Sequence, residues 1–211
     1  MACSLGGARV PEAQARLGRA ALAAKDCTTA IKWVTAAARQ GLPAAQFQLG
    51  SMYDHGQCIW QDFRRAAEWY SRAAEDSMPE ALYHLGTLFE QGRGVPQDYF
   101  KAINLYFAAA QQGYYPAIFK MGLMFLHGRG VQKDDGWALA WFFRSDVITP
   151  PGTPQAEFIE RHARAMVTAV VGQPDDPDEA GRLAEKMKPD EIRRAQRLAA
   201  MPWKGLPQPP R

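Results

Sequence analysis

The four histidines are the first side chains to consider for chemistry, because imidazole can move protons or bind metals near neutral pH. His55 and His127 each stand directly before a glycine, and Gln91 holds the position midway between them. Glutamine cannot shuttle a proton, so its exchange with histidine predicts a hydrogen-bonding role beside a turn. His84 and His162 lie in other contexts, and we expect His162 on a solvated helix face.

Acid–base and nucleophilic chemistry would need groups that face each other. Asp54 and His55 are adjacent, and adjacent residues of a helix do not face each other. The pairs Asp134–Asp135 and Asp175–Asp176 are typical of helix caps and solvated loops. No spacing in the sequence defines a nucleophile with its base, and no glycine-rich phosphate loop occurs. We therefore expect no catalytic residues, no cofactor and no metal site.

The three cysteines cannot all pair within the chain, and they form no CxxC motif. We expect Cys27 and Cys58 to be small, half-buried thiols. The spacing is compatible with a disulfide between them, but does not favour one.

Composition and charge narrow the class of partner. The chain has 211 residues, of which 47% are hydrophobic and 22% charged, and its formal net charge is +3. Without a dense block of Lys and Arg, this charge predicts no nucleic-acid partner. No apolar run is long enough for a transmembrane helix. Ala2-Cys3 is compatible with the stub of a lipoprotein site or with an ordinary disordered start. The compartment stays open, with a slight preference for the bacterial periplasm over the cytoplasm.

The elements that carry these residues follow from an internal repeat. A first block recurs at steps of 36 residues, as Ala45–Tyr53, Ala81–Phe89 and Ala117–Phe125. A second block keeps the same step, as Ala30–Val34, Ala66–Tyr70, Ala102–Tyr106 and Ala138–Phe142. In the first repeat the two blocks are closer together, because Gly18 precedes Gly50 by only 32 residues.

Both blocks have the apolar periodicity of α-helices. The Gly-Arg-Gly-Val segments at 92–95 and 128–131 predict a sharp turn between the two helices of a repeat. Asp62, Asp98 and Asp134 then stand where a short carboxylate can cap the second helix. Gly50, Gly86 and Gly122 lie inside the first helices, which predicts that the second helix crosses there too closely for a Cβ.

These motifs together resemble the Sel1-like repeat family, which is related to tetratricopeptide repeats. The resemblance implies an all-α fold, a right-handed superhelical α/α solenoid of helical hairpins. We expect a flexible N-terminus at 1–11 and four repeats over 12–146, at about 12–43, 44–79, 80–115 and 116–146. The first repeat lacks the Gly-x-Gly turn, and Cys58 replaces the second glycine in the next repeat. That substitution predicts a wider or more strained turn.

The C-terminal part departs from the repeat. Residues 147–203 are predicted to form capping helices, at 154–171, at 177–187 and from Pro189 onward. The last residues, 204–211, are predicted to be a disordered tail.

The predicted binding surface is the strip of first-helix positions that changes from repeat to repeat. A superhelical stack presents its first helices on the concave side. Packing positions must keep their character, whereas positions that contact a partner are free to vary. The expected partner-binding residues are Gln48, Ser51, His55, His84, Thr87, Gln91, Lys120, Leu123 and His127. Their mixed polar character suits a protein or peptide, with Leu123 as an exposed apolar anchor.

The leading hypothesis is therefore a monomeric, non-catalytic scaffold or adaptor that binds a protein. The resemblance implies the same function, since that family works mostly in bacterial protein–protein interaction. An inhibitor or immunity protein against a bacterial toxin is one alternative. A β-lactam-related enzyme and a peptidoglycan-binding protein are the others, although the cysteine-rich relatives linked to β-lactams carry a cysteine pair in each repeat.

Overall fold

The computed structural model describes residues 10–147 and 188–201, and every element in these two ranges is an α-helix. The chain divides into two compact units, residues 1–98 and 99–211. None of the described helices has the length and apolar character needed to cross a membrane.

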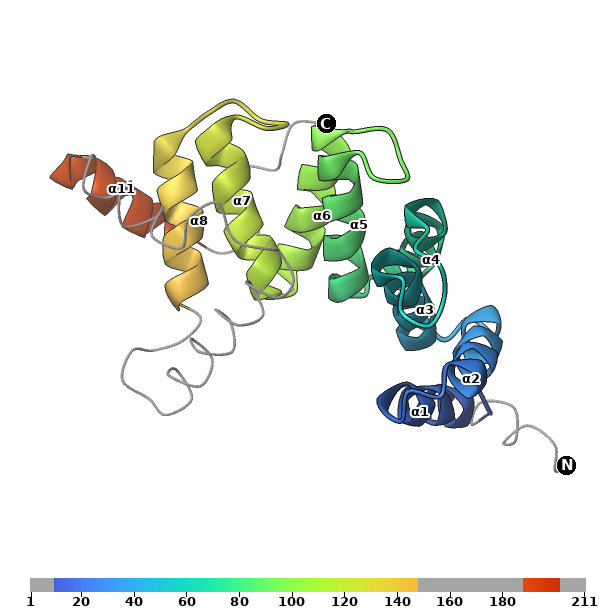
Figure 1. Cartoon of the computed structure of the whole chain (residues 1–211). Helices are drawn as coiled ribbons and strands as arrows, with labels where there is room; N and C mark the ends of the chain where they lie inside the picture. Colours follow the sequence, from blue (N-terminus) through green and yellow to red (C-terminus); the bar gives the residue numbers. More distant parts are fainter. Residues whose placement is uncertain (1–9, 148–187, 202–211) are drawn as a thin grey trace, which may run out of the picture. The chain divides into compact units, whose positions relative to one another are not determined.

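Unit 1 consists of consecutive antiparallel helices (Figure 1). They are α1 (Val10–Ala23), α2 (Cys27–Arg39), α3 (Pro43–His55), α4 (Phe63–Glu75) and α5 (Pro79–Gln91). The helices α1 and α2 form one hairpin, and α3 and α4 form the next. Each later first helix also packs on the second helix before it, α3 on α2 and α5 on α4. The core of unit 1 is thus a row of small and apolar side chains between neighbouring helices.

Unit 2 repeats this arrangement and ends in a helix outside the 36-residue pattern. Its helices are α6 (Tyr99–Gln111), α7 (Tyr115–His127), α8 (Asp135–Val147) and α11 (Pro189–Ala199). The helix α7 packs on α6 and forms a hairpin with α8, while α11 packs against α8. The predicted helices at 154–171 and 177–187 lie outside the described residues.

The turn signals in the sequence act where they were expected to act. The first helices α3, α5 and α7 begin with proline in the first turn and end at a glycine with φ of 66°. The Asp62 carboxylate accepts a hydrogen bond from the backbone N–H of Arg65 at 3.0 Å. Asp134 does the same for Trp137 at 3.0 Å. The local sequence thereby fixes where each hairpin turns.

The glycines inside the first helices allow the second helix to approach closely. A Cβ on Gly50 would lie 2.7 Å from Cδ1 of the Tyr70 ring, and one on Gly18 would lie 2.5 Å from Cγ2 of Val34. These distances are shorter than ordinary van der Waals contact, so a methyl group would push the second helix away. A Cβ on Gly122 would likewise lie 2.4 Å from Cε1 of Phe142, so the prediction that these glycines serve packing is confirmed for Gly50 and Gly122.

The second glycine of the turn touches the start of the preceding second helix. A Cβ on Gly94 would lie 2.5 Å from the carbonyl oxygen of Phe63, and one on Gly130 would lie equally close to that of Tyr99. Cys58 stands at this position in its repeat and takes the same left-handed backbone, with φ of 65°. The turn is therefore not wider, but a non-glycine residue holds a backbone that glycine adopts more readily.

Cys58 forms a disulfide with Cys27, with their Cα atoms 5.0 Å apart, so the expectation of two separate thiols is wrong. The physical reason lies in the repeat. Cys27 begins α2 as Phe63 begins α4, and the turn position of Cys58 packs directly on that helix start. The disulfide thus replaces a backbone contact that glycine makes in the other repeats, and it links the first hairpin to the second.

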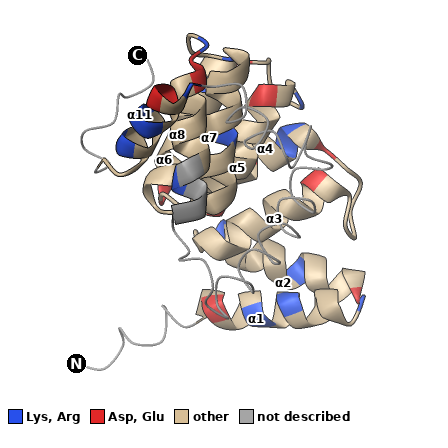
Figure 2. Ribbon diagram, turned by 90° about the vertical axis from the view of Figure 1, so that its left-hand side faces the viewer, with Lys and Arg blue, Asp and Glu red and all other residues tan. Residues whose placement is uncertain are grey.

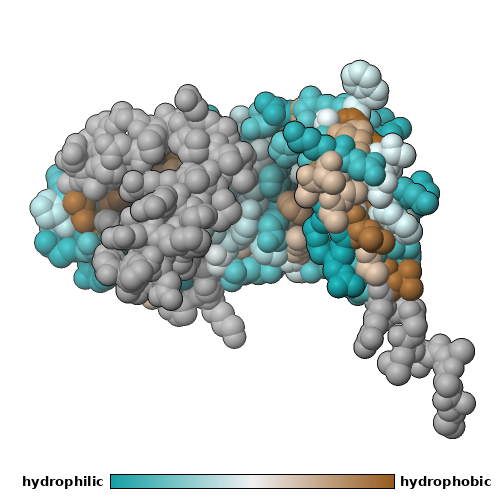
Figure 3. Space-filling model, turned by 60° about the horizontal axis from the view of Figure 1, so that its bottom comes forward, coloured by the Kyte–Doolittle hydropathy of each residue, from teal (hydrophilic) through white to brown (hydrophobic). Residues whose placement is uncertain are grey.

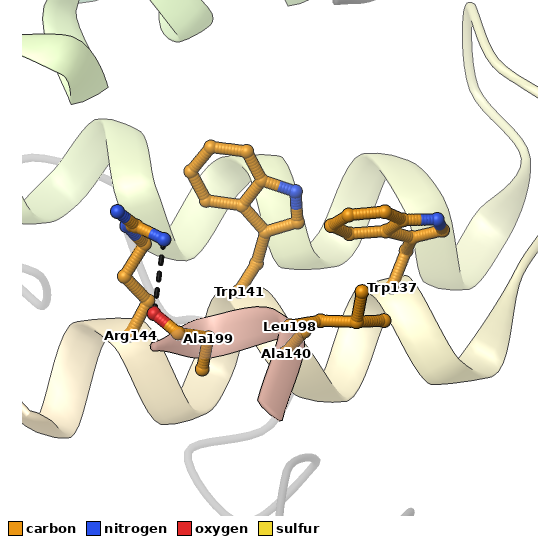
Figure 4. A pocket seen from close by; sticks show the side chains of 6 residues that line it. All are labelled: Trp137, Ala140, Trp141, Arg144, Leu198 and Ala199. Atoms are coloured by element: carbon orange, nitrogen blue, oxygen red, sulfur yellow. Dashed lines mark hydrogen bonds between the residues drawn. The ribbon is translucent and has the colours of Figure 1, made fainter. Parts of the chain in front are cut away.

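The contact between α11 and α8 is held at one end by Arg144. Its guanidinium donates hydrogen bonds of 2.9 Å to the carbonyl oxygens of Ala199 and Met201. These carbonyls lie at the end of α11, where a positive charge is favourable. Trp137, Trp141 and Leu198 complete the seam between the two helices (Figure 4). The seam is a shallow crevice between packed side chains, so we interpret it as a structural contact.

Candidate functional site

The predicted strip is only partly at the surface. His55, Gln91 and His127, which end α3, α5 and α7, are exposed. Gln48, Ser51, His84 and Thr87 are half-buried. The unit 1 part of the strip lies on α3 and α5, and the unit 2 part lies on α7.

Lys120 and Leu123 are buried, with exposed fractions of 7% and 6%, so the prediction that they are exposed is wrong. The helix α7 is apolar around most of its circumference, and residues 116–118, 120–125 are all buried. A strip chosen only by its phase on a helix assumes that one side faces solvent. In α7 that assumption fails, because this helix is packed on more sides than an ordinary amphipathic helix.

The half-buried residues of unit 1 gather around His84. Its imidazole stacks on the Tyr70 ring at 5.4 Å and also contacts the rings of Phe47 and Tyr83, at 5.5 and 5.4 Å. Nδ1 of His84 also lies 4.0 Å from Oδ2 of Asp54. Neighbouring first helices therefore meet across this face, which explains why the strip is half-buried and not fully exposed.

Burial decides the charge of this cluster. Burial, and to a smaller extent the charge of His55, lowers the pKa of His84 to about 4, so the imidazole is neutral at pH 7. Asp54 would favour the charged imidazole, but a separation of 4.0 Å is too long for a hydrogen bond. Burial and the Asp54 charge raise the pKa of Tyr70, whose hydroxyl donates to Oδ2 of Asp54 at 3.1 Å. The Asp54 carboxylate is thus held by a tyrosine and not by an ion pair.

Ser51 and His55 are the only pair in this cluster that resembles a nucleophile with its base. Their Oγ and Nδ1 atoms lie 3.3 Å apart, but the same Nδ1 lies 2.9 Å from the carbonyl oxygen of Ser51. A carbonyl only accepts, so Nδ1 carries the proton and cannot remove one from Ser51. The geometry gives His55 the hydrogen-bonding role beside the turn that the exchange with Gln91 predicted.

The cluster does not resemble a metal site either. Within the described parts of the chain, no three His, Cys, Asp or Glu side chains are grouped so that they could hold a metal ion. The site in unit 1 is a set of aromatic rings with a neutral imidazole, a tyrosine-bound carboxylate and exposed polar ends. Such a surface suits binding by shape and hydrogen bonds.

Comparison with known proteins now assigns the family. The sequence profile of the Sel1 repeat matches residues 11–42, 43–77, 79–114 and 116–145, which together are more than half of the chain. This chain belongs to the Sel1 repeat family. The resemblance inferred from the motifs is confirmed, and members of this family are generally scaffolds for protein–protein interaction. The comparison with curated proteins gives no match.

Solved structures support the same fold of Sel1 repeats. A Sel1 repeat protein from Oxalobacter formigenes is 28% identical with a TM-score of 0.63, over 93% of this chain and 89% of that one. A protective antigen of uropathogenic Escherichia coli strains, which displays an SLR fold, is 27% identical with a TM-score of 0.65. The match covers 83% of this chain but only 37% of the antigen. The expected all-α solenoid of helical hairpins is confirmed.

Two residues of the site were missed by reasoning from the sequence, Asp54 and Tyr70. Asp54 was considered only with its neighbour His55, whereas the Sel1 repeat fold turns it toward Tyr70 of α4 and His84 of α5. A signal was present, because an acidic residue recurs one period later at Glu90. Because the first and second helices of each repeat are separated by a fixed number of residues, the acidic position could have been predicted to face the tyrosine.

Proposed function

We propose that this Sel1 repeat protein is a non-catalytic scaffold that binds a protein or peptide across the first-helix face of α3 and α5. The binding surface consists of Gln48, Ser51, His55, His84, Thr87 and Gln91. In unit 2, His127 is exposed at the end of α7, and we include it as a separate partner-binding residue of that unit. Family membership supports the general function, and the side chains of this face support the location.

One observation carries the proposal. Gln48 and His84 occupy the same position of successive repeats on α3 and α5, and both are polar although neither is exposed. Burying polar groups lowers stability unless they are hydrogen-bonded, and an apolar residue would pack there more favourably. Polar groups kept at one position of a repeat, each with different chemistry, are what a surface that recognises a partner requires.

The exposed ends of the helices supply the accessible part of the surface. His55 is oriented by its hydrogen bond to the carbonyl oxygen of Ser51, and Gln91 is exposed one repeat later. Between them lies His84, whose orientation is fixed by the rings around it. Side chains that are already ordered lose less conformational entropy when a partner binds, and this favours affinity.

The test compares charges placed on this face with equal charges placed elsewhere. The variant His55→Glu/Gln91→Glu adds two negative groups at exposed positions of the first helices. The control Ser71→Glu/Gln111→Glu adds two negative groups at exposed positions of the second helices. Each protein serves as bait for proteins from the source cell, and the recovered partner is then purified and titrated.

We expect the control to bind the purified partner like the wild type, and the first-helix variant to bind at least about tenfold more weakly. A photo-crosslinking residue at position 55 should also form a covalent adduct with the partner, whereas one at position 71 should not. Equal binding by both variants would overturn the proposed surface.

A further inference from the structure

The carboxylate of Asp54, on the proposed binding face, has no positively charged partner among the described residues. Its Oδ2 accepts a hydrogen bond from the Tyr70 hydroxyl, and no other described group donates to it. Gln61 donates to the backbone carbonyl oxygen of Asp54 at 2.6 Å and not to its side chain. Only 16% of the Asp54 side chain is exposed, so most of its hydration is lost. A charge in such a position lowers stability unless it is paired.

The arginines near this face are engaged with other groups. Residues 43–98 include no lysine and four arginines, and each guanidinium lies beside a group other than Asp54. The neighbour is a carboxylate for two of them and an aromatic ring for the other two, in the pairs Arg64–Glu68, Arg65–Asp62, Arg72–Trp69 and Arg93–Phe63. This part of the chain therefore leaves the charge of Asp54 uncompensated.

The two first helices of this face are acidic. The helices α3 and α5 contain Asp54, Glu80 and Glu90 but neither lysine nor arginine, and Figure 2 shows α3 without a basic residue, unlike α1 and α2. Residues 43–98 contain eight acidic residues and four arginines, hence a formal charge of −4, whereas the whole chain has +3. Over unit 1, on the right in Figure 3, hydrophilic residues are interspersed among hydrophobic ones. The charge of this region favours a positively charged partner.

His84 supplies a second acceptor beside the carboxylate. Its imidazole contacts aromatic rings but makes no hydrogen bond with another described residue, and 14% of its side chain is exposed. A neutral imidazole has one nitrogen that accepts hydrogen bonds. With Nδ1 as that nitrogen, two acceptors lie 4.0 Å apart, and a single nitrogen atom of a cation can lie within about 3 Å of both. The adjacent rings of Tyr70 and Phe47 favour a planar guanidinium, which stacks on aromatic faces.

We infer that this face recognises an arginine side chain of its partner, which Asp54 and His84 bind together. The inference rests on the proposed scaffold function and names the chemistry that the partner presents to this surface. The guanidinium pairs with the Asp54 carboxylate and donates to the His84 imidazole, so both acceptors gain a hydrogen bond that the described residues do not provide. Hydrogen bonds between charged groups are about twice as strong as those between neutral groups.

The first experiment tests the site without the partner. The full chain is titrated with N-acetylarginine amide, and the backbone amide signals of residues 54 and 84 are followed by NMR. N-acetylcitrulline amide has nearly the same shape without the charge and is the control ligand. We expect saturable shifts with the arginine compound alone, with a dissociation constant on the order of 1–10 mM for so small a ligand. Asp54→Asn should abolish these shifts, whereas Glu75→Gln, which removes an exposed carboxylate of α4, should leave them unchanged.

Three results of this titration would overturn the inference: no saturable shift with the arginine compound, equal shifts with the citrulline compound, or unchanged binding by Asp54→Asn. A lysine at position 84 provides an internal check. Lys120 occupies the corresponding position of α7 and is buried there, so the repeat accommodates a lysine side chain. His84→Lys should place an ammonium group beside Asp54 and block the arginine compound, and retained binding by this variant would also contradict the inference. Circular dichroism of each variant confirms that it is folded.

The second experiment uses the purified partner and separates this inference from the proposed function. Asp54→Asn should bind the partner at least about tenfold more weakly than the wild type, and Glu75→Gln should bind it equally well. Glutamates at positions 55 and 91 should not strengthen this contact, because their exposed charges are screened by the solvent. A photo-crosslink at position 55 together with wild-type affinity of Asp54→Asn would support the face but refute the arginine. Binding of the arginine compound without that crosslink would refute the proposed scaffold surface instead.

Discussion

The Cys27–Cys58 disulfide gives the sharpest prediction about stability. The bond joins the start of α2 to the turn after α3, so it ties the first hairpin to the next repeat. In an array of repeats, each unit is held mainly by its neighbours, and among the described helices the α1–α2 hairpin packs on one neighbouring repeat, through α3. Removing the bond should therefore weaken the first hairpin more than the rest of unit 1.

The size of the effect follows from the length of the closed loop. The two cysteines are 31 positions apart in the sequence. The loss of loop-closure entropy in the unfolded chain then corresponds to about 3.7 kcal/mol, and observed values for disulfides are commonly about 2–4 kcal/mol. We expect the Cys27→Ala/Cys58→Ala variant to lose about 3 kcal/mol of unfolding free energy.

The assay combines urea unfolding with hydrogen exchange followed by mass spectrometry. Peptides from α1 and α2 should lose most of their protection in the double variant, while peptides from α5 should change little. Treating the wild type with a reductant should reproduce the behaviour of the variant, and Cys3→Ser should behave like the oxidised wild type. If the double variant unfolds at the wild-type urea concentration, the bond does not stabilise the fold as argued.

A second variant separates the crosslink from the backbone. Cys58 has φ of 65°, where Gly94 and Gly130 have φ of 69° and 72°. In the absence of the disulfide, Cys27→Ala/Cys58→Gly should therefore be more stable than Cys27→Ala/Cys58→Ala by about 1 kcal/mol. Equal stability of these two variants would refute the claim that the turn requires a left-handed residue.

Three further predictions concern packing, protonation and the C-terminal helix. Gly94→Ala should cost about 3 kcal/mol or more in urea unfolding, because its Cβ would meet backbone atoms, whereas Gly41→Ala has open space and should lose only about 1 kcal/mol. The pKa of His84 is about 4 in the folded state and 6.5 ordinarily, so its contribution to stability is present above pH 6.5 and is lost as the pH falls toward 4. Unfolding free energies measured at pH 7 and at pH 4.5 should show that the wild type loses about 2 kcal/mol more stability over this range than His84→Gln does. An equal loss in the two proteins would contradict the neutral imidazole. Arg144→Ala should release the end of α11, with a loss of about 1–3 kcal/mol, seen as faster hydrogen exchange in residues 189–199; unchanged exchange there would show that these hydrogen bonds do not hold the helix.

The sequence alone determined the repeat, the helices and their ends. Gly50 and Gly122 recur at a fixed step because each repeat has the same close helix crossing. The glycine before each turn and the aspartate after it act within a few residues, so their effect could be predicted locally. The family followed from the same motifs.

Only the tertiary structure decided which side chains are accessible and which meet. Lys120 and Leu123 lie on the same side of their helix as accessible positions of other repeats, yet both are buried. Burial depends on every element packed around a helix, and the position of a residue on the helix does not reveal those elements. Asp54 reaches Tyr70 and His84 because three helices converge, which no adjacent pair in the sequence reveals.

The disulfide shows the limit most clearly. Cys27 and Cys58 are separated by the same 31 positions as Phe63 and Gly94, so this equal spacing could be read from the sequence. The spacing predicts a contact only when the turn of one repeat is known to pack on the start of the second helix of the repeat before it. A contact between repeats depends on how hairpins stack, and a period in the sequence does not specify the stacking geometry.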